Sequence, residues 1–371
     1  MLLGGPLVRV CSEHHNEDVH LAVLVALKSL FVSNGTSMKA FVGPLQTAIF
    51  KPLSSPSKKV RNAAVELISF AIEFSRRVDP FVIEVNTRMF GDLSASIKYD
   101  YLIALSHVFY KVGTQISTST RQQSYQIIID HLAVSYSKVN YASAQALSSY
   151  LYSADKDEFA YLLDNVVLDV SFGTEYVGEE LAEELQSAQL MLFRYILQKI
   201  VKLSDQSLDE MFNICMKRFS SAYDSVREPL VKAIEGILLF DDTPTSLQNQ
   251  ALDQLAFLVT DESPVVRHAS LLTCYRLALF KKELLQRKLL LFMPGFLAGI
   301  QVRNTEQRKR AEYVVCLVLE TDRGNQGVDD FRSKADQELG DAVMFYFDKI
   351  LTKIDVSQLR DVDSSAEVLM L

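Results

Sequence analysis

The chain has 371 residues, of which 49% are hydrophobic and 10% aromatic, far too many for a disordered protein. Its 38 basic and 46 acidic residues give a net charge of −8, which excludes a chain that binds nucleic acid over its whole surface. No stretch approaches eighteen uninterrupted apolar residues, and the first residues lack the charge and cleavage site of a signal peptide. The sequence therefore predicts neither a membrane-spanning helix nor a secretion signal.

The clearest pattern is a helical opening that returns about every forty residues. Val226-Arg227 and Val266-Arg267 each begin an apolar run with helical spacing, soon after an acidic residue. Val60-Arg61 makes the same opening, 41 residues after Val19. A helical pattern with this period is typical of stacked helix pairs, and it predicts an all-α solenoid of about eight HEAT-type pairs. Arrays of this kind present extended surfaces to partners.

The predicted helix pairs follow one another along the whole chain. Gly and Pro residues, such as Gly113 and Pro80, mark their ends and beginnings. In chain order the pairs are expected at 16–34 with 37–53, 55–75 with 80–91, 96–112 with 118–134, 140–154 with 155–170, 179–201 with 204–219, 224–240 with 246–260, 263–280 with 284–299 (kinked or broken at Pro294), and 305–320 with 333–354.

Four parts of the chain are expected to differ in character. Residues 1–170 form the N-terminal repeats, and 171–179 form an irregular connection with Gly173 and Gly178, which should be exposed and open to proteases. Residues 180–354 form the C-terminal repeats, and 355–371 form a short acidic tail. Within the fourth pair, the unusually small side chains of Ala142, Ala144 and Ala146 predict a close approach of two helices.

No arrangement of residues in the sequence is typical of a catalytic site. There is no glycine-rich phosphate loop after a strand and no Gly-x-Ser-x-Gly motif. The histidines at 14, 15 and 20 lie beside Cys11, but their spacing is that of a solvated loop rather than a metal site. The four cysteines are widely spaced, which indicates reduced, mostly buried thiols. We predict a non-enzymatic protein without cofactor or metal.

Two sets of basic residues depart from the acidic average and are candidate partner-binding surfaces. The N-terminal basic set comprises Lys58, Lys59, Arg61, Arg76 and Arg77. The C-terminal basic set comprises Lys281, Lys282, Arg303, Arg308, Lys309 and Arg310. Arg61, Arg227 and Arg267 have a second interpretation, because in HEAT-type pairs an arginine at this position commonly bonds one repeat to the next. No aromatic residues alternate with the basic ones, which argues against single-strand readout.

The N-terminal residues resemble one family of HEAT-repeat proteins. The resemblance rests on four motifs in order: Leu3-Gly-Gly-Pro-Leu-Val-Arg9, Phe41-Val-Gly-Pro-Leu-Gln-Thr-Ala-Ile-Phe-Lys-Pro-Leu53, Val60-Arg-Asn-Ala-Ala-Val-Glu-Leu67 and Arg77-Val-Asp-Pro80. This succession is similar to the C-terminal region of the giant HEAT-repeat translational activator of general amino-acid control. The similarity is strongest over residues 3–82 and weaker beyond, and few motifs match between residues 84 and 260.

The resemblance implies a cytosolic, ribosome-associated scaffold. Members of the family activate the kinase that phosphorylates the α subunit of initiation factor 2 during amino-acid starvation. The implied partners are the ribosome and the RWD domain of that kinase or of other proteins, with no membrane and no sequence-specific nucleic acid. The end of the kinase-docking region would lie within residues 1–100. The alternative is another cytosolic HEAT adaptor, such as a nuclear transport receptor or a proteasome scaffold.

Overall fold

The computed structural model describes residues 4–13, 16–132, 137–168, 179–200 and 202–300, together with five positions between 308 and 318. Every regular element in these ranges is helical. The chain divides into two compact units. Unit 1 contains residues 1–203 and 214–218, and unit 2 contains residues 204–213 and 219–371.

Unit 1 begins with α1 (Gly4–Ser12), a helix that the sequence pattern does not predict. The further helices of this unit are α2 (Glu17–Asn34), the 3-10 turn η1 (Gly35–Met38), α3 (Lys39–Ala48), α4 (Phe50–Leu53), α5 (Lys58–Ala71), η2 (Ile72–Phe74), α6 (Asp79–Met89), α7 (Ala95–Val112), η3 (Gly113–Gln115), α8 (Thr118–Leu132), α9 (Ser137–Tyr152), α10 (Lys156–Leu162), the π-helical turn η4 (Leu163–Val167) and α11 (Glu179–Lys199).

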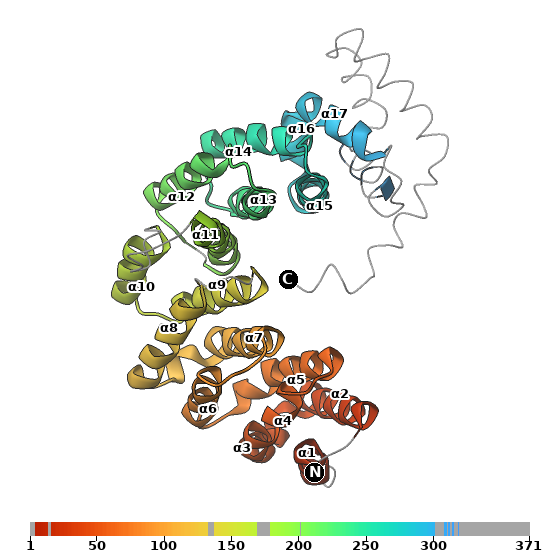
Figure 1. Cartoon of the computed structure of the whole chain (residues 1–371), viewed down its shortest axis with the longest axis vertical. Helices are drawn as coiled ribbons and strands as arrows, with labels where there is room; N and C mark the ends of the chain where they lie inside the picture. The colour runs from red at the N-terminus through yellow and green to blue at the C-terminus, as the bar shows by residue number, and fades with distance from the viewer. Residues whose placement is uncertain are drawn as a thin grey trace. The chain divides into compact units, whose positions relative to one another are not determined.

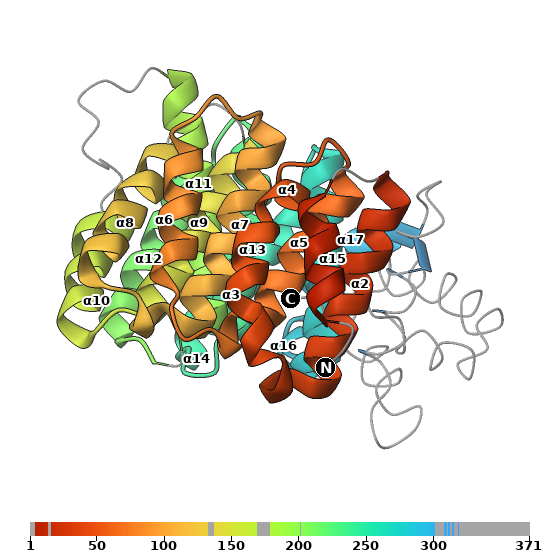
Figure 2. The same cartoon turned by 90° about the horizontal axis from the view of Figure 1, so that it is seen from below.

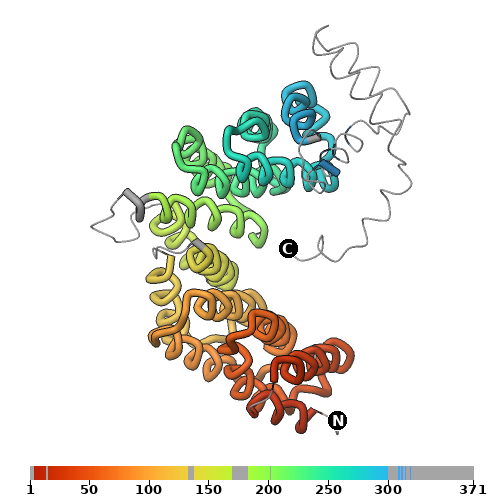
Figure 3. Tube along the Cα trace, turned by 45° about the vertical axis from the view of Figure 1, so that its right-hand side comes forward, coloured from red at the N-terminus to blue at the C-terminus, as the bar shows by residue number. Residues whose placement is uncertain are grey.

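The residues of α12 (Asp205–Arg218) fall in both units. Unit 2 then continues with α13 (Asp224–Leu239), α14 (Thr245–Leu258), α15 (Pro264–Phe280), α16 (Lys282–Arg287) and α17 (Leu289–Ile300). Within this unit α13 and α15 lie side by side and α14 packs on both, as the green-to-blue part of the tube in Figure 3 shows. The predicted eighth pair, residues 171–178 of the predicted 171–179 connection and the acidic tail lie outside the described residues, apart from the five positions between 308 and 318, and residue 179 belongs to α11.

Unit 1 has two layers of helices. The helices α2, α5, α7, α9 and α11 pack side by side in chain order, and α6 and α8 pack beside each other over α7 and α9 (Figure 1). In the turned view the helices of this unit run nearly parallel or antiparallel to one another (Figure 2). Each repeat therefore contacts its neighbours in sequence, as the forty-residue period predicts.

Polar contacts join successive repeats at fixed positions. The N-terminal Ser57 of α5 donates from Oγ to Glu17, 40 residues earlier, and Ser263 before α15 donates to Asp224, 39 residues earlier (2.6 and 2.9 Å). The Asp79 carboxylate accepts from the Ser117 backbone N–H ahead of α8, at 2.9 Å. An acid in the first turn of one helix thus helps to satisfy the start of the equivalent helix in the next repeat.

The predicted inter-repeat bonding of Arg61 and Arg227 is confirmed. Arg61 is 4% exposed and its Nε donates to Asp100 in the next repeat, while Nη1 donates to the carbonyls of Ser55 and Pro56 (2.8 and 3.0 Å). Arg227 holds both carboxylate oxygens of Asp261, at 2.9 and 3.0 Å. Its equivalent Arg267 donates from Nη1 to the backbone carbonyls at 261 and 262 (2.7 and 2.8 Å). Both units therefore use arginine to fix the start of a helix.

The cores of both units contain the residues that the helical stripes predict. The five positions chosen from those stripes are all buried: Val60, Leu67, Val226, Val266 and Leu271. The small stripe of α9 also behaves as predicted, because Ala142, Ala144 and Ala146 are at most 1% exposed. There α9 packs against both α7 and α11. Cys11, Cys215 and Cys274 are free and buried, as expected.

A polar seam runs along one edge of α9. Lys199, in the last turn of α11, donates from Nζ to the Oγ atoms of Ser148 and Ser149 (3.0 and 2.5 Å), and Ser149 also bonds Ser106 of α7 at 2.8 Å. Burial of the ammonium group lowers the pKa of Lys199 to about 7. Burial also lowers the pKa of His107, with Lys199 as the next cause, to about 4. Serine hydroxyls therefore satisfy a cation that the small side chains of α9 admit.

The helices differ from those expected at several places, and the expected helix at 37–53 is divided among η1, α3 and α4. The sequence pattern does not predict α1, because this helix is short and contains Gly4, Gly5 and Pro6. An added Cβ at Gly4 would lie 3.0 Å from the Phe41 ring, so a glycine here permits the close contact between α1 and α3. In the seventh pair, α17 continues through Pro294, and the break falls at Lys288 instead.

One stretch over α2, η1 and α3, residues 17–48, has the length and mean hydropathy (1.4) of a membrane-spanning helix. It is interrupted by the 3-10 turn, and its Lys28 pairs with Glu66 of α5 at 2.8 Å. Within α2, Leu24 and Leu27 are fully buried and the helix packs on α1 and α5. Packing accounts for the buried part of this stretch, 28% of its most apolar window, whereas Val25 and Val32 are more than half exposed, and the absence of a membrane span stays a prediction.

Candidate docking groove

The structure does not bring the N-terminal basic set together. Lys58 and Lys59 are exposed at the beginning of α5, whereas Arg76 and Arg77 are exposed beyond its end. Twelve further residues of α5 and the 3-10 turn η2 follow Lys59 before the arginines, which puts the two pairs roughly 20 Å apart along the axis, more than two Debye lengths at physiological ionic strength. Arg61 is buried against Asp100 and is not available to a partner. The predicted cluster is therefore two separate pairs of exposed cations.

The C-terminal basic set is partly neutralised within unit 2. Lys281 pairs with Asp241 at 3.1 Å and also donates to the Phe240 carbonyl, at 3.2 Å. Lys282 is half-buried in the first turn of α16. Arg308 and Lys309 are exposed, and Arg303 and Arg310 lie outside the described residues.

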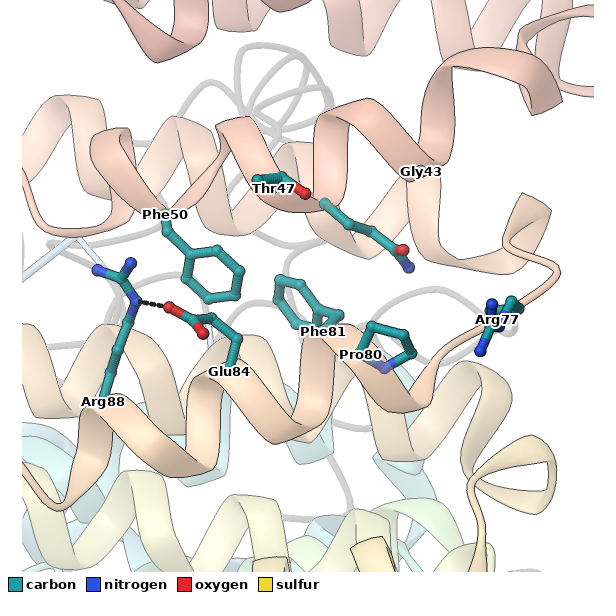
Figure 4. Close-up of a pocket in the computed structure, with 9 residues that line it drawn as sticks. Gly43, Thr47, Phe50, Arg77, Pro80, Phe81, Glu84 and Arg88 are labelled. Carbon is teal, nitrogen blue, oxygen red and sulfur yellow. Dashed lines mark hydrogen bonds and ion pairs between the residues drawn. The ribbon is translucent and has the colours of Figure 1, made fainter.

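Arg77 instead lies at one end of a groove between α3–α4 and α6. The groove has a volume of about 440 Å³, and Phe50 and Phe81 stack across it with ring centroids 5.2 Å apart (Figure 4). Gly43 leaves its upper wall open, because no atom lies within 4 Å of an added Cβ. The lining residues are Gly43, Gln46, Thr47, Phe50, Arg77, Pro80, Phe81, Glu84 and Arg88.

A second arginine stands at the opposite end. The Arg88 guanidinium lies 4.8 Å from the centroid of the Phe50 ring, and its Nε donates to Glu84 at 2.6 Å (Figure 4). Eleven residues separate it from Arg77, or roughly 16 Å at helical rise. Glu84 balances the charge of Arg88, whereas the Arg77 side chain makes no ion pair with any described residue. The groove therefore has an apolar floor, a positive end and a net positive charge.

Side-chain hydrogen bonds fix the loop that carries Arg77. Gln46 of α3 is 8% exposed and donates to Ser75 Oγ at 2.9 Å, and Ser75 donates in turn to the Arg77 carbonyl at 2.9 Å. Sequence reasoning missed Gln46 and Arg88, because neither stands in a basic run. The signals present were the Glu84–Arg88 spacing of four residues on a helix opened by Pro80.

Comparison with known proteins relates the chain to a translational regulator. No protein-family model matches. The eIF-2-alpha kinase activator GCN1 of Saccharomyces cerevisiae is 26% identical over 295 residues, which cover 76% of this chain and 11% of that protein. The stalled ribosome sensor GCN1 of Homo sapiens is 24% identical over 170 residues, which cover 46% of this chain and 6% of that protein. Over most of its length the chain is therefore similar to a HEAT-repeat region of GCN1. The matched part spans only 11% of the yeast protein's length and 6% of the human protein's length.

Solved structures support the fold of this GCN1-like region. Importin beta superposes with a TM-score of 0.54, and the match covers 92% of this chain and 44% of the importin beta chain at 13% sequence identity. Likeness at this identity concerns architecture alone. The described residues form an all-α solenoid of stacked helix pairs, as the forty-residue period predicts.

Proposed function

We propose that this chain is a scaffold region that couples ribosomes to activation of the initiation factor 2 α kinase during amino-acid starvation. The observation that carries the proposal is the match to the yeast eIF-2-alpha kinase activator GCN1 over 76% of the chain. The name of the human relative, a stalled ribosome sensor, supports the ribosome as the second partner. A cytosolic location, a C-terminal position in a longer array and the absence of catalysis belong to the same proposal.

The groove between α3–α4 and α6 is the proposed kinase-docking surface. It lies within residues 43–88, the part of the chain that carries the family motifs. The buried rings of Phe50 and Phe81 form its base, the exposed Pro80 supplies apolar area, and Arg77 supplies donors for a carboxylate at one end. An RWD domain with an acidic, partly apolar surface has the chemistry to bind there. Neither a nuclear transport receptor nor a proteasome scaffold has comparable support, since the likeness to importin beta concerns the fold alone.

Two changes in the groove should weaken binding of the kinase's RWD domain about tenfold or more, which corresponds to about 1.4 kcal/mol or more. Gly43→Glu places a carboxylate over the open wall without a clash and improves helix propensity. The double change Arg76→Glu/Arg77→Glu reverses the charge at the groove's open end. Biolayer interferometry with the isolated RWD domain measures both effects. Binding to the wild-type chain should also weaken as salt rises, because charge contacts are screened.

The matched control is Lys58→Glu/Lys59→Glu, which makes the same change in net charge at the other end of α5. It should retain most of the RWD affinity. If this pair loses binding while the groove variants keep it, the docking surface lies at the start of α5. If all three variants bind as the wild type does, the kinase contact does not use these cations, and the groove assignment is wrong.

A further inference from the structure

A second cavity lies in unit 1, away from the proposed docking groove. It has a volume of about 610 Å³, within the range of about 300–1,000 Å³ that small ligand sites occupy. The residues around it come from η3, α8, the end of α9 and α10. Three tyrosines line it, from three different helices: Tyr125, Tyr150 and Tyr161. Neither the family resemblance nor the proposed function uses this cavity.

The inner wall already contains one bound guanidinium. Arg121 is buried, and its guanidinium lies 4.5 Å from the centroid of the Tyr150 ring. Its Nη2 donates to Glu158 Oε2 at 3.0 Å, and its Nη1 donates to Ser153 Oγ at 3.0 Å. Glu158 Oε1 accepts from the Tyr150 hydroxyl at 2.6 Å. Burial and this carboxylate raise the pKa of Tyr150, so the hydroxyl stays a neutral donor. The fold thus shows that an arginine fits between these aromatic and acidic groups.

The outer wall repeats the same chemistry without an arginine to fill it. The Tyr161 side chain is 65% exposed, and Tyr125 is half-buried with its ring centroid 5.6 Å from that of Tyr150. Asp155 and Asp157 are exposed at the start of α10, where Lys156 is the single basic residue. Aromatic faces beside uncompensated carboxylates attract cations, and guanidinium groups in particular stack on such rings.

We propose that this cavity binds an arginine side chain from a basic segment of a partner protein. The incoming guanidinium stacks against Tyr161 and Tyr125, and the carboxylates at the N-terminus of α10 balance its charge. The preference for arginine follows from Arg121, which shows the planar group seated on Tyr150. This surface is distinct in sign from the α3–α6 groove, whose net charge favours an acidic partner. One unit of the array would then hold an acid-binding and an arginine-binding surface on different repeats.

The test uses the full chain and a fluorescein-labelled peptide with three arginines separated by Gly-Ser pairs. Fluorescence polarisation should show saturable binding by the wild-type chain. Tyr161→Ala should weaken it roughly 3- to 30-fold, the range that a cation–aromatic contact supplies. Asp155→Asn should also weaken it while keeping the helix cap, because asparagine caps as well as aspartate. A peptide with citrulline at the three positions keeps the shape without the charge and should not bind.

The matched control is Tyr152→Ala, which removes an exposed tyrosine of the same unit outside the cavity. Its peptide affinity should equal that of the wild-type chain, and circular dichroism should show that all variants keep their helices. The proposal is overturned if the wild-type chain does not bind the arginine peptide. It is also overturned if the citrulline peptide binds with the same affinity as the arginine peptide. The same holds if Tyr152→Ala and Tyr161→Ala weaken peptide binding equally.

Discussion

Asp100→Ala should lower the free energy of unfolding by about 3–5 kcal/mol, the cost of leaving a buried charge without its partner. Arg61 is 4% exposed and Asp100 2% exposed, so water cannot replace the lost carboxylate. The Arg61 guanidinium would keep its bonds to the carbonyls of Ser55 and Pro56, which cannot balance its charge. Urea denaturation followed by circular dichroism measures the change.

Two further variants test whether the loss of stability comes from the unpaired buried charge. Lys111→Ala breaks an exposed ion pair, in which the side chains of Lys111 and Glu73 are 38% and 41% exposed. It should lower the free energy of unfolding by less than about 1 kcal/mol. The apolar double replacement Arg61→Met/Asp100→Leu should recover much of the loss, because no unpaired charge remains. An Asp100→Ala chain as stable as the Lys111→Ala chain would show that the buried pair does not fasten these repeats together.

Leu67→Ala should cost about 2–5 kcal/mol, because it opens a cavity in the middle of a packed layer. Leu67 is fully buried in α5, which packs between α2 and α7. The matched control is Val32→Ala on α2, whose side chain is 61% exposed and whose loss should cost about 0.5 kcal/mol or less. Equal effects of the two changes would contradict the assignment of inner and outer helix faces in unit 1.

The repeat architecture could be predicted from the sequence because the same physical requirement recurs every forty residues. Each pair must bury one apolar stripe and satisfy one helix start, and the Val-Arg opening does both at Val60-Arg61 and Val226-Arg227. The acids that receive these arginines follow 39 and 34 residues later, at Asp100 and Asp261. Periodic contacts leave a periodic pattern, and the pattern needs no knowledge of the structure to be found.

The candidate surfaces could be predicted only in part. Lys58, Lys59, Arg76 and Arg77 are close in sequence, but a helix of fourteen residues holds the two pairs apart. Conversely, Arg77 and Arg88 border the same groove because α6 lies opposite α3 and α4 (Figure 4). The tyrosine-lined cavity likewise brings together Tyr125, Tyr150 and Tyr161, which no motif connects. Such groupings depend on the distance and rotation between neighbouring helices, which the hydrophobic period does not specify.

We propose that this GCN1-like region can replace the matching segment of a kinase activator. The most direct measurement replaces the matching segment of the yeast protein, to which the chain is 26% identical over 295 residues, with this chain. Phosphorylation of the initiation factor 2 α subunit is then followed during amino-acid starvation. We expect phosphorylation well above that of a strain with the segment deleted, and a loss of this gain in a chimera with Arg76→Glu/Arg77→Glu. The proposed coupling to the kinase would be contradicted by a chimera that is expressed and sediments with ribosomes, if phosphorylation of the α subunit in its strain is no higher than in the deletion strain.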